Sequence, residues 1–225
     1  MVTTFTAVCF CYIGALVGAG FASGKEMELF FTRFGCASFF STAMAGLLFA
    51  FLAYATMVLC PKKQITSLPA FFSFCLGKLG GKIMYRLLQL FLFFSVTVMI
   101  AASDNLYQVF FRGAPGTGGI LLCLFLFAGL LRPQKGMVLS NLILVPLLMA
   151  MMIFLWQNAI SFSAITAELQ TISNNFFQQL TAAFLWAMLY VSYNFLGASA
   201  ILVPFCQGNH QKSAAWGGFT AGILL

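Results

Sequence analysis

Long apolar segments separated by short polar ones dominate the chain, and this pattern predicts membrane-spanning helices. About 20 consecutive apolar residues cross a bilayer as a helix. Six stretches qualify as predicted spans: 5–34, 36–59, 83–103 (with an extension to 111), 117–131, 137–156 and 180–206. A further apolar stretch, 214–225, is too short to cross alone. We therefore expect an all-α polytopic membrane protein with a single transmembrane domain over 1–225.

Two of the connecting segments are longer than the rest. Residues 61–82 hold Pro, Gly and Lys around the apolar core SLPAFFSFCLG, which predicts an interfacial helix between polar turns. Residues 157–178 are rich in Ser, Thr, Asn and Gln, and they predict a more exposed loop in which a short helix is an option.

Composition excludes several classes of protein. Hydrophobic residues make up 62% of the chain and charged residues only 7%, whereas a soluble domain has about 25% charged residues. So few charges cannot cover a water-facing surface, which argues against a soluble enzyme, a nucleic-acid binder or a disordered protein.

The cysteines are scattered, there is no CxxC and His210 is the only histidine, so we expect no metal site and no cofactor. Without a nucleophile–base pair, an HExxH motif or an acidic cluster, an enzyme is not expected.

Basic residues predict the orientation of the chain. With the N-terminus inside, the outer loops hold only Arg33 and Arg112, leaving Lys25 aside. The inner loops then hold Lys62, Lys63, Lys78, Lys82, Arg86, Arg132, Lys135 and Lys212. Since inner loops carry the excess of Lys and Arg, we expect a multi-pass protein of the cell membrane with a cytoplasmic N-terminus.

The first predicted span is too long, and glycines interrupt it at its midpoint. Residues 5–34 would form a helix of about 45 Å, while the hydrocarbon core is about 30 Å thick. The midpoint falls in VGAGFASGKE, which holds Gly18, Gly20 and Gly24. Each glycine weakens a helix by about 1 kcal/mol relative to alanine. We expect an unwound segment, whose backbone groups are tolerable only where they line a cavity or bind something.

The sixth predicted span, 180–206, carries a similar polar interruption. Its midpoint is Tyr193, next to Ser192 and Asn194, with Gly197 one turn further. Spans one and six are five apart, so matching interruptions indicate two inverted repeats with a solute site between them. The first repeat would cover 1–156, and the second would begin over 180–225.

Three other interpretations of these residues stay open. The glycine spacings at 14–18 and 20–24 are also small-xxx-small motifs for helix packing. Residues 25–28 could begin an interfacial helix after a short first span. Tyr193 and Asn194 could form an interhelical hydrogen-bonding pair without any ligand.

Two segments resemble a known family. YIGALVGAGFASGKEMELFFTRFG (12–35) is similar to the opening helix of the YkvI family of bacterial membrane proteins, whose hallmark is close to GxxVGAGFASGxE followed by FF. GKLGGKIMYRLLQLFLFF (77–94) resembles that family's third span. The resemblance, which extends over essentially the whole chain, implies the amino acid–polyamine–cation superfamily and its LeuT-like fold of two inverted five-helix repeats. That fold has about ten spans, so this chain resembles an N-terminal portion that is truncated at the C-terminus.

The chain differs from the pattern of this family late in the third predicted span. Small residues are expected late in the third span, where this chain has Ser103, Asp104 and Asn105. Asp104 is therefore expected at the outer interface rather than in the site.

The predicted substrate site lies between the two interruptions. Half-helix N-termini attract an anionic group, and half-helix C-termini and exposed carbonyls attract a cation. Ser23 and Asn194 would hydrogen-bond the solute, while Phe21 and Tyr193 would gate it or stack on it. The complete predicted set is Gly18, Ala19, Gly20, Phe21, Ala22 and Ser23, facing Ser192, Tyr193, Asn194 and Gly197.

Glu26 is the candidate for ion or proton coupling. It lies about 10 Å past the midpoint of the first span, still within the bilayer, where an unpaired charge is costly and a functional candidate. Lys25 and Glu28 are spaced to pair with each other, which would leave Glu26 to carry a proton or attract a cation. The alternative is a solvated charge in an outer vestibule.

These features favour a secondary transporter of an amino acid or a related small organic solute. Its expected partners are that solute, Na+ or H+, and the lipid bilayer, with no nucleic acid. The alternative is a sensor or receptor subunit that binds a solute in the same fold without moving it, as some germinant-receptor subunits of this superfamily are thought to do. The sequence leaves the oligomeric state open.

Overall fold

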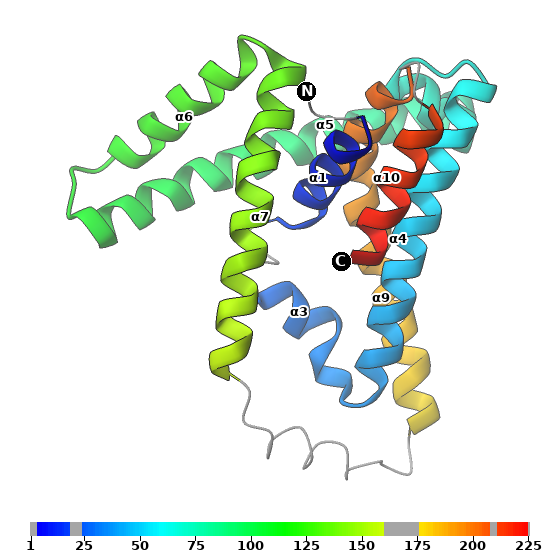
Figure 1. The fold of residues 1–225 in the computed structure, drawn as a ribbon, viewed down its shortest axis with the longest axis horizontal. Helices are drawn as coiled ribbons and strands as arrows, with labels where there is room; N and C mark the ends of the chain where they lie inside the picture. Colours follow the sequence, from blue (N-terminus) through cyan, green and yellow to red (C-terminus); the bar gives the residue numbers. More distant parts are fainter. Residues whose placement is uncertain (1–3, 19–23, 160–175, 208–210, 225) are drawn as a thin grey trace. The chain divides into compact units, whose positions relative to one another are not determined.

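A computed structural model describes residues 4–18, 24–159, 176–207 and 211–224, and all regular secondary structure within these ranges is helical (Figure 1). The helices are α1 (Thr4–Leu16), α3 (Lys25–Phe30), η1 (Thr32–Phe34), α4 (Ala37–Lys62), α5 (Leu68–Phe111), α6 (Thr117–Leu130), α7 (Pro133–Ala159), α9 (Phe176–Phe205) and α10 (Gln211–Leu224). The all-helical prediction is confirmed for the described residues.

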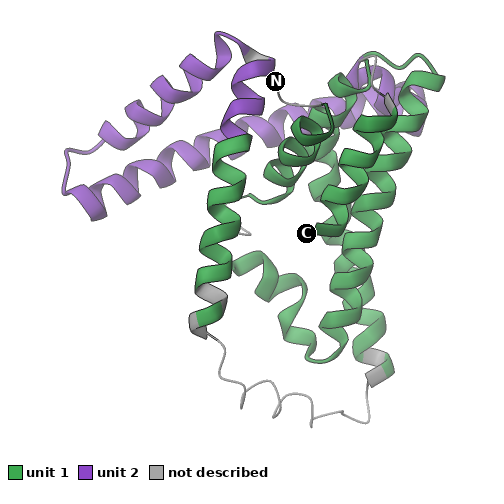
Figure 2. Cartoon of the chain, in the orientation of Figure 1, with its two compact units in different colours: residues 1–66, 142–225 green, residues 67–141 purple. Residues whose placement is uncertain are grey.

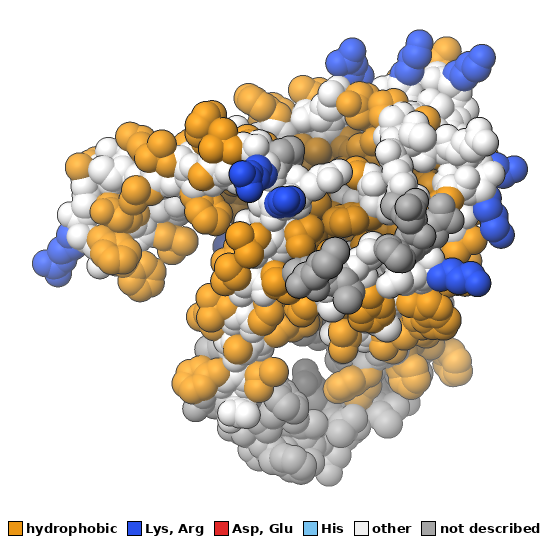
Figure 3. Space-filling view, turned by 45° about the horizontal axis from the view of Figure 1, so that its top comes forward, with side chains coloured by type: hydrophobic (Ala, Val, Ile, Leu, Met, Phe, Trp, Pro, Cys, Tyr) orange, Lys and Arg blue, Asp and Glu red, His pale blue; other side chains and the backbone are white. Residues whose placement is uncertain are grey.

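Four of these helices are long and apolar enough to cross a membrane. The qualifying segments are Ala37–Lys62, Leu68–Phe111, Gln134–Phe154 and Gln179–Phe205, while α1 and α6 are shorter apolar helices. Large hydrophobic side chains lie on the outside of these helices, as in Phe39 and Phe110, which are 68% and 75% exposed. Figure 3 shows hydrophobic side chains over much of the visible face, with Lys and Arg side chains sparse among them. Apolar surface on this scale is suited to lipid rather than water, so the chain is a membrane protein.

The chain divides into two compact units (Figure 2). Unit 1 comprises residues 1–66 and 142–225, and unit 2 comprises residues 67–141. Unit 1 contains α1, α3, α4, α9, α10 and most of α7, and unit 2 contains α5, α6 and the start of α7.

Unit 1 is built on close contact between the last helix and the first ones. α10 packs on α4 and α1, and α9 packs on the same two helices. A Cβ added at Gly222 would lie 2.3 Å from the backbone N of Ala50, and one added at Gly217 would lie 2.6 Å from the carbonyl oxygen of Phe5. Only glycine permits such contact, which is how helices approach in membranes, where small residues let backbones touch.

A buried hydrogen bond also joins α1 to α4. The hydroxyl of Tyr12, a side chain with no exposed surface, donates to the carbonyl oxygen of Phe49 at 3.0 Å. Interhelical hydrogen bonds in membranes contribute about 0.6–2 kcal/mol. This bond fixes α1 beside α4 just before the first predicted interruption.

In unit 2, α5 bends sharply at one glycine. Gly77 has φ 76° and ψ 170°, which divides α5 into arms 68–76 and 78–111. The predicted interfacial helix and the third predicted span are therefore the two arms of one kinked helix. Left-handed φ values are accessible to glycine and costly for other residues, so the bend depends on Gly77.

Beyond the second arm of α5, the chain reverses into α6. The carboxylate of Asp104 accepts hydrogen bonds from the Gly118 N–H at 3.1 Å and from Gln108 Nε2 at 2.7 Å. An acidic side chain stabilises a helix N-terminus by accepting from its exposed N–H groups. Asp104 thus caps α6 inside unit 2.

The two predicted interruptions have different outcomes. α1 ends at Leu16, and α3 begins at Lys25 after Gly24, which has a φ of 74°, so the described residues on the two sides of the first predicted interruption belong to separate helices. Residues 19–23, where the prediction is centred, lie outside the described residues. By contrast, α9 is a continuous helix of 30 residues through Tyr193, so the predicted interruption of the sixth span is wrong.

The polar side chains at the middle of α9 bond to the backbone of the same helix. Ser192 Oγ donates to the carbonyl oxygen of Met188 at 2.7 Å, and Asn194 Nδ2 donates to that of Tyr190 at 3.0 Å. These polar side chains therefore bond one turn back along their own helix. A lone glycine, Gly197, costs about 1 kcal/mol, which is too little to unwind a packed helix.

The packing of α10 gives a testable prediction. Gly222→Ala should lower the unfolding free energy by about 1–3 kcal/mol, because its new methyl group collides with the backbone of α4. The matched control is Gly197→Ala, since an added Cβ there meets no described atom within 4 Å and alanine favours a helix by roughly 0.5–1 kcal/mol. Thermal unfolding of the purified protein in detergent, followed by tryptophan fluorescence, compares the two. Equal midpoints for both variants would contradict the close α10–α4 contact.

Candidate functional site

The candidate site lies in unit 1, where the broken first segment meets α9. α3 begins after Gly24, whose φ of 74° lies in the left-handed region that favours glycine. Among the described residues, no atom lies within 4 Å of a Cβ added at Gly18 or Gly24. The start of a new helix at Lys25 agrees with both the broken-span hypothesis and the interfacial-helix alternative.

Glu26, in the first turn of α3, faces two tyrosines of α9. Its carboxylate lies close enough to Tyr190 and Tyr193 to interact electrostatically with both hydroxyls. Glu26 is half-buried, whereas Lys25 and Glu28 are exposed. The predicted coupling residue is thus the acidic group of α3 that is drawn into the protein.

A cluster of aromatic rings holds α3 against α9. The Phe30 ring centroid lies 5.6 Å from that of Trp186, 5.3 Å from that of Tyr190 and 5.7 Å from that of Tyr193. The three α9 residues follow i, i+4, i+7 spacing, which places them on one helix face. Edge-to-face and tilted ring contacts of this kind contribute about 0.5–1.5 kcal/mol each beyond their buried area. We call Phe30, Phe31, Trp186, Tyr190 and Tyr193 the aromatic cluster.

The cluster extends to its neighbours on both sides. The ring centroid of Tyr190 lies 5.1 Å from that of Phe31 and 5.9 Å from that of Phe49 in α4. The Arg33 guanidinium carbon lies 4.0 Å from the ring centroid of Trp186, a cation–π contact. Tyr190, 5% exposed, is the centre of this arrangement.

A small cavity of about 30 Å³ adjoins the cluster, lined by Leu16, Met27, Phe31, Phe49 and Tyr190 together with small residues of α4. One water needs roughly 10–15 Å³ measured this way, whereas a small-molecule pocket needs about 300–1,000 Å³. The described residues therefore enclose room here for a water molecule or two, and not for an organic solute.

The predicted site residues are distributed unevenly around this arrangement. Tyr193 lies against Glu26, and Gly197 is one turn further on the same face of α9. Asn194 bonds to its own helix, and Ser192 is exposed about 100° around the helix from Tyr193. Gly18 is exposed just beyond the end of α1. Ala19, Gly20, Phe21, Ala22 and Ser23 lie outside the described residues.

The structure adds residues that the sequence interpretation missed, chiefly Trp186, Tyr190 and Phe30. Their signal was the i, i+4, i+7 spacing of aromatic residues on the sixth span. As for metals, the described ranges contain no group of three or more His, Cys, Asp or Glu side chains that could hold an ion. One carboxylate beside two phenols and several ring faces is instead suited to a cationic amino group or a loosely bound monovalent cation.

The four helices of spanning length in the described part of the chain define it as a helical membrane protein. It is similar to the uncharacterized membrane protein YkvI of Bacillus subtilis (strain 168), with 26% identity over 220 residues, 97% of this chain and 62% of the relative. It is also similar to the uncharacterized protein YyaD of the same organism, with 29% identity over 192 residues, 84% of this chain and 53% of the relative. The chain thus spans less than two thirds of each relative. No family model and no solved structure matches it.

Contact between Glu26 and Tyr193 can be tested by a double-mutant cycle. Glu26→Gln, Tyr193→Phe and the double variant should show a coupling of about 0.5–3 kcal/mol in unfolding free energy, because the two side chains share one interaction. Glu28→Gln is the matched control, since Glu28 is exposed on the same short helix. Additive effects for Glu26 and Tyr193, or equal coupling for Glu28, would contradict the contact.

Proposed function

We propose that this protein is a secondary transporter of a small organic solute that carries an amino group, such as an amino acid, and that it couples transport to a Na+ or H+ gradient. The observation that carries the proposal is the placement of Glu26, beside a break in the first apolar segment, against Tyr190 and Tyr193 of a spanning helix.

The physical argument concerns the cost of a charge and of unpaired backbone in lipid. An ionisable side chain within a membrane segment is expensive and is a functional candidate by default. A helix that ends within the bilayer leaves carbonyl groups without partners, which is tolerable only beside a cavity or a ligand. Glu26 and the carbonyl end of α1 together favour a positively charged group. An amino group of the solute, or the coupling cation, would supply that charge.

We further propose a LeuT-like arrangement of two inverted repeats, with α9 beginning the second. Support comes from the contact of α1 with α9, five predicted spans apart, as the first helices of the two repeats should be. In this proposal α9 supplies side chains to the site rather than loosened backbone, since it is continuous. Gating would consist of the aromatic cluster separating and closing again over the solute.

Transport predicts a measurable flux that depends on Glu26. Proteoliposomes containing the protein should accumulate a radiolabelled amino acid when a Na+ or H+ gradient is imposed. Glu26→Gln should lower the initial rate by at least about tenfold, the scale of a lost charge-assisted contact of 1.5–3 kcal/mol, and should abolish the dependence on pH or Na+. Glu28→Gln should leave both unchanged.

The same assay separates the competing functions. Saturable binding of the amino acid without accumulation would favour the sensor alternative over transport. If Glu26→Gln left the uptake rate and its ion dependence unchanged, the coupling role of Glu26 would be wrong.

We also propose that the protein lies in the cell membrane with its N-terminus in the cytoplasm. In a background with the exposed Cys75 and Cys123 and the half-buried Cys36 replaced by serine, Lys63→Cys should resist a membrane-impermeant maleimide in intact cells. Arg112→Cys should react with it. The positive-inside rule places these two positions on opposite sides. The reverse labelling pattern would overturn this orientation.

A further inference from the structure

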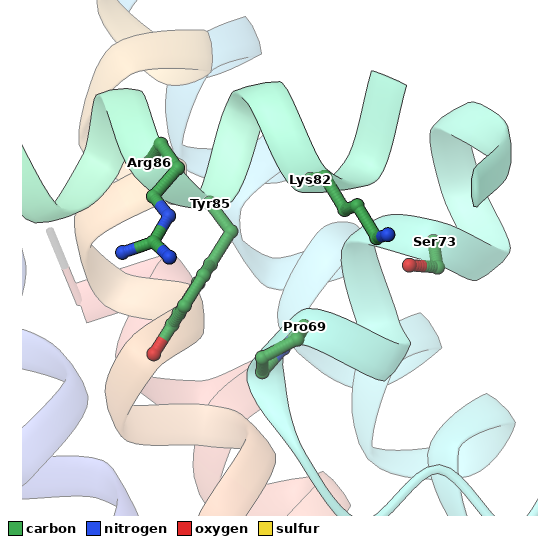
Figure 4. Close-up of a pocket in the computed structure, with 5 residues that line it drawn as sticks. All are labelled: Pro69, Ser73, Lys82, Tyr85 and Arg86. Atoms are coloured by element: carbon green, nitrogen blue, oxygen red, sulfur yellow. The ribbon is translucent and has the colours of Figure 1, made fainter. Parts of the chain in front are cut away.

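We propose that a pocket in unit 2, at the bend of α5, binds the phosphate group of an anionic ligand. The pocket has a volume of about 300 Å³ and is lined by Pro69, Ser73, Lys82, Tyr85 and Arg86 (Figure 4). It belongs entirely to unit 2 and does not depend on the transporter proposal, which concerns unit 1.

Glycines fix the shape of this pocket. Gly77 reverses the chain direction with a φ of 76°. A Cβ added at Gly81 would lie 2.5 Å from the backbone N of Ser73 and 2.6 Å from its Cα. The two arms of α5 therefore touch backbone to backbone at Gly81 and Ser73. The side chains that follow on the second arm are held beside the first arm by this contact, so the pocket is built by the fold rather than by mobile side chains.

Every polar side chain that lines the pocket can donate hydrogen bonds. Lys82 and Arg86 are four residues apart, which puts both cations on one face of the second arm. Figure 4 shows the Lys82 ammonium group directed toward the Ser73 hydroxyl and the Arg86 guanidinium beside the ring of Tyr85. Arg86 Nη1 donates to Gln89 Oε1 at 3.2 Å, which uses one of the five N–H groups of the guanidinium.

Negative charge in unit 2 is confined to one distant residue. Asp104 is the only Asp or Glu between residues 67 and 141, and its carboxylate is engaged with Gly118 and Gln108. It lies 18 residues beyond Arg86 on the same helix arm, or about 27 Å at 1.5 Å per residue. At that distance it does not neutralise the pocket, because the Debye length is about 8 Å at physiological salt.

Phosphate matches this donor set. A guanidinium fork binds two phosphate oxygens at once, an ammonium binds as a point charge, and hydroxyls donate to the remaining oxygens. The same chemistry is present in a soluble phosphate compound and in a phospholipid headgroup. The surroundings favour the headgroup, because Leu79 is 78% exposed and Ile83 56% exposed on the arm that carries the cations. Acyl chains would cover these apolar side chains.

Lipid titration tests the proposal on the purified full chain in a non-ionic detergent. Phosphatidylglycerol should bind saturably, measured by native mass spectrometry and by the rise in melting temperature, while zwitterionic phosphatidylcholine should bind much more weakly. The variant Lys82→Gln/Arg86→Gln should weaken phosphatidylglycerol binding about thirtyfold, since each cation near an anionic lipid surface contributes about 1 kcal/mol.

The matched control removes the same charge elsewhere. Lys62 and Lys63 are exposed at the end of α4 in unit 1, so Lys62→Gln/Lys63→Gln should keep binding within about twofold of the wild type if contacts rather than net charge matter. Equal loss in both double variants would show attraction by overall charge alone and overturn the pocket. No loss in either would overturn it as well.

Competition with inorganic phosphate distinguishes a phospholipid headgroup from a soluble phosphate compound. Failure of millimolar phosphate to displace phosphatidylglycerol, with the pocket variant defective, would assign the site to a lipid headgroup. Displacement by phosphate, with stabilisation by phosphate alone that the pocket variant loses, would assign it to a soluble phosphate compound.

Discussion

Lipid offers no hydrogen bonds, so each backbone group within a span must find its partner inside the protein. α9 meets this constraint by remaining helical and by turning the polar side chains of Ser192 and Asn194 onto its own carbonyls. In the first segment, α1 ends at Leu16 and α3 begins at Lys25, while residues 19–23 lie outside the part of the chain that the structure describes. Glu26, which is half-buried near Tyr190 and Tyr193 of α9, follows in the first turn of α3, and this placement is the basis of the proposed site.

Hydropathy predicted most of the helices because span length is set by bilayer thickness. The predicted spans 36–59, 137–156 and 180–206 correspond to α4, α7 and α9 with ends displaced by a few residues. The joining of two predicted elements into α5 was not foreseen, because a single φ value at Gly77 decides whether a helix ends or bends. The continuity of α9 was also missed, since side-chain bonds to the preceding turn have no signature in hydropathy.

The candidate site was predictable in its parts but not as an assembly. The sequence indicated both residues separately. Glu26 is a charged residue in the first predicted span, and Tyr193 is the residue at the midpoint of the sixth. Their contact depends on how α3 turns back toward α9, which no local pattern encodes. Tyr190 and Trp186 were not predicted, because 16% of the chain is aromatic. In such a chain, aromatic residues at helical spacing are common and do not by themselves indicate a site.

The contact between α10 and α1 has a consequence for folding during synthesis. Gly217 touches the backbone of Phe5, residues separated by nearly the whole chain, so this contact has a very high sequence separation. During synthesis the first helix enters the membrane long before its partner leaves the ribosome. Until then, the surfaces of α1 and α4 that contact α10 lack this partner. Such late closure of non-local contacts is slow, and it exposes the nascent chain to misassembly.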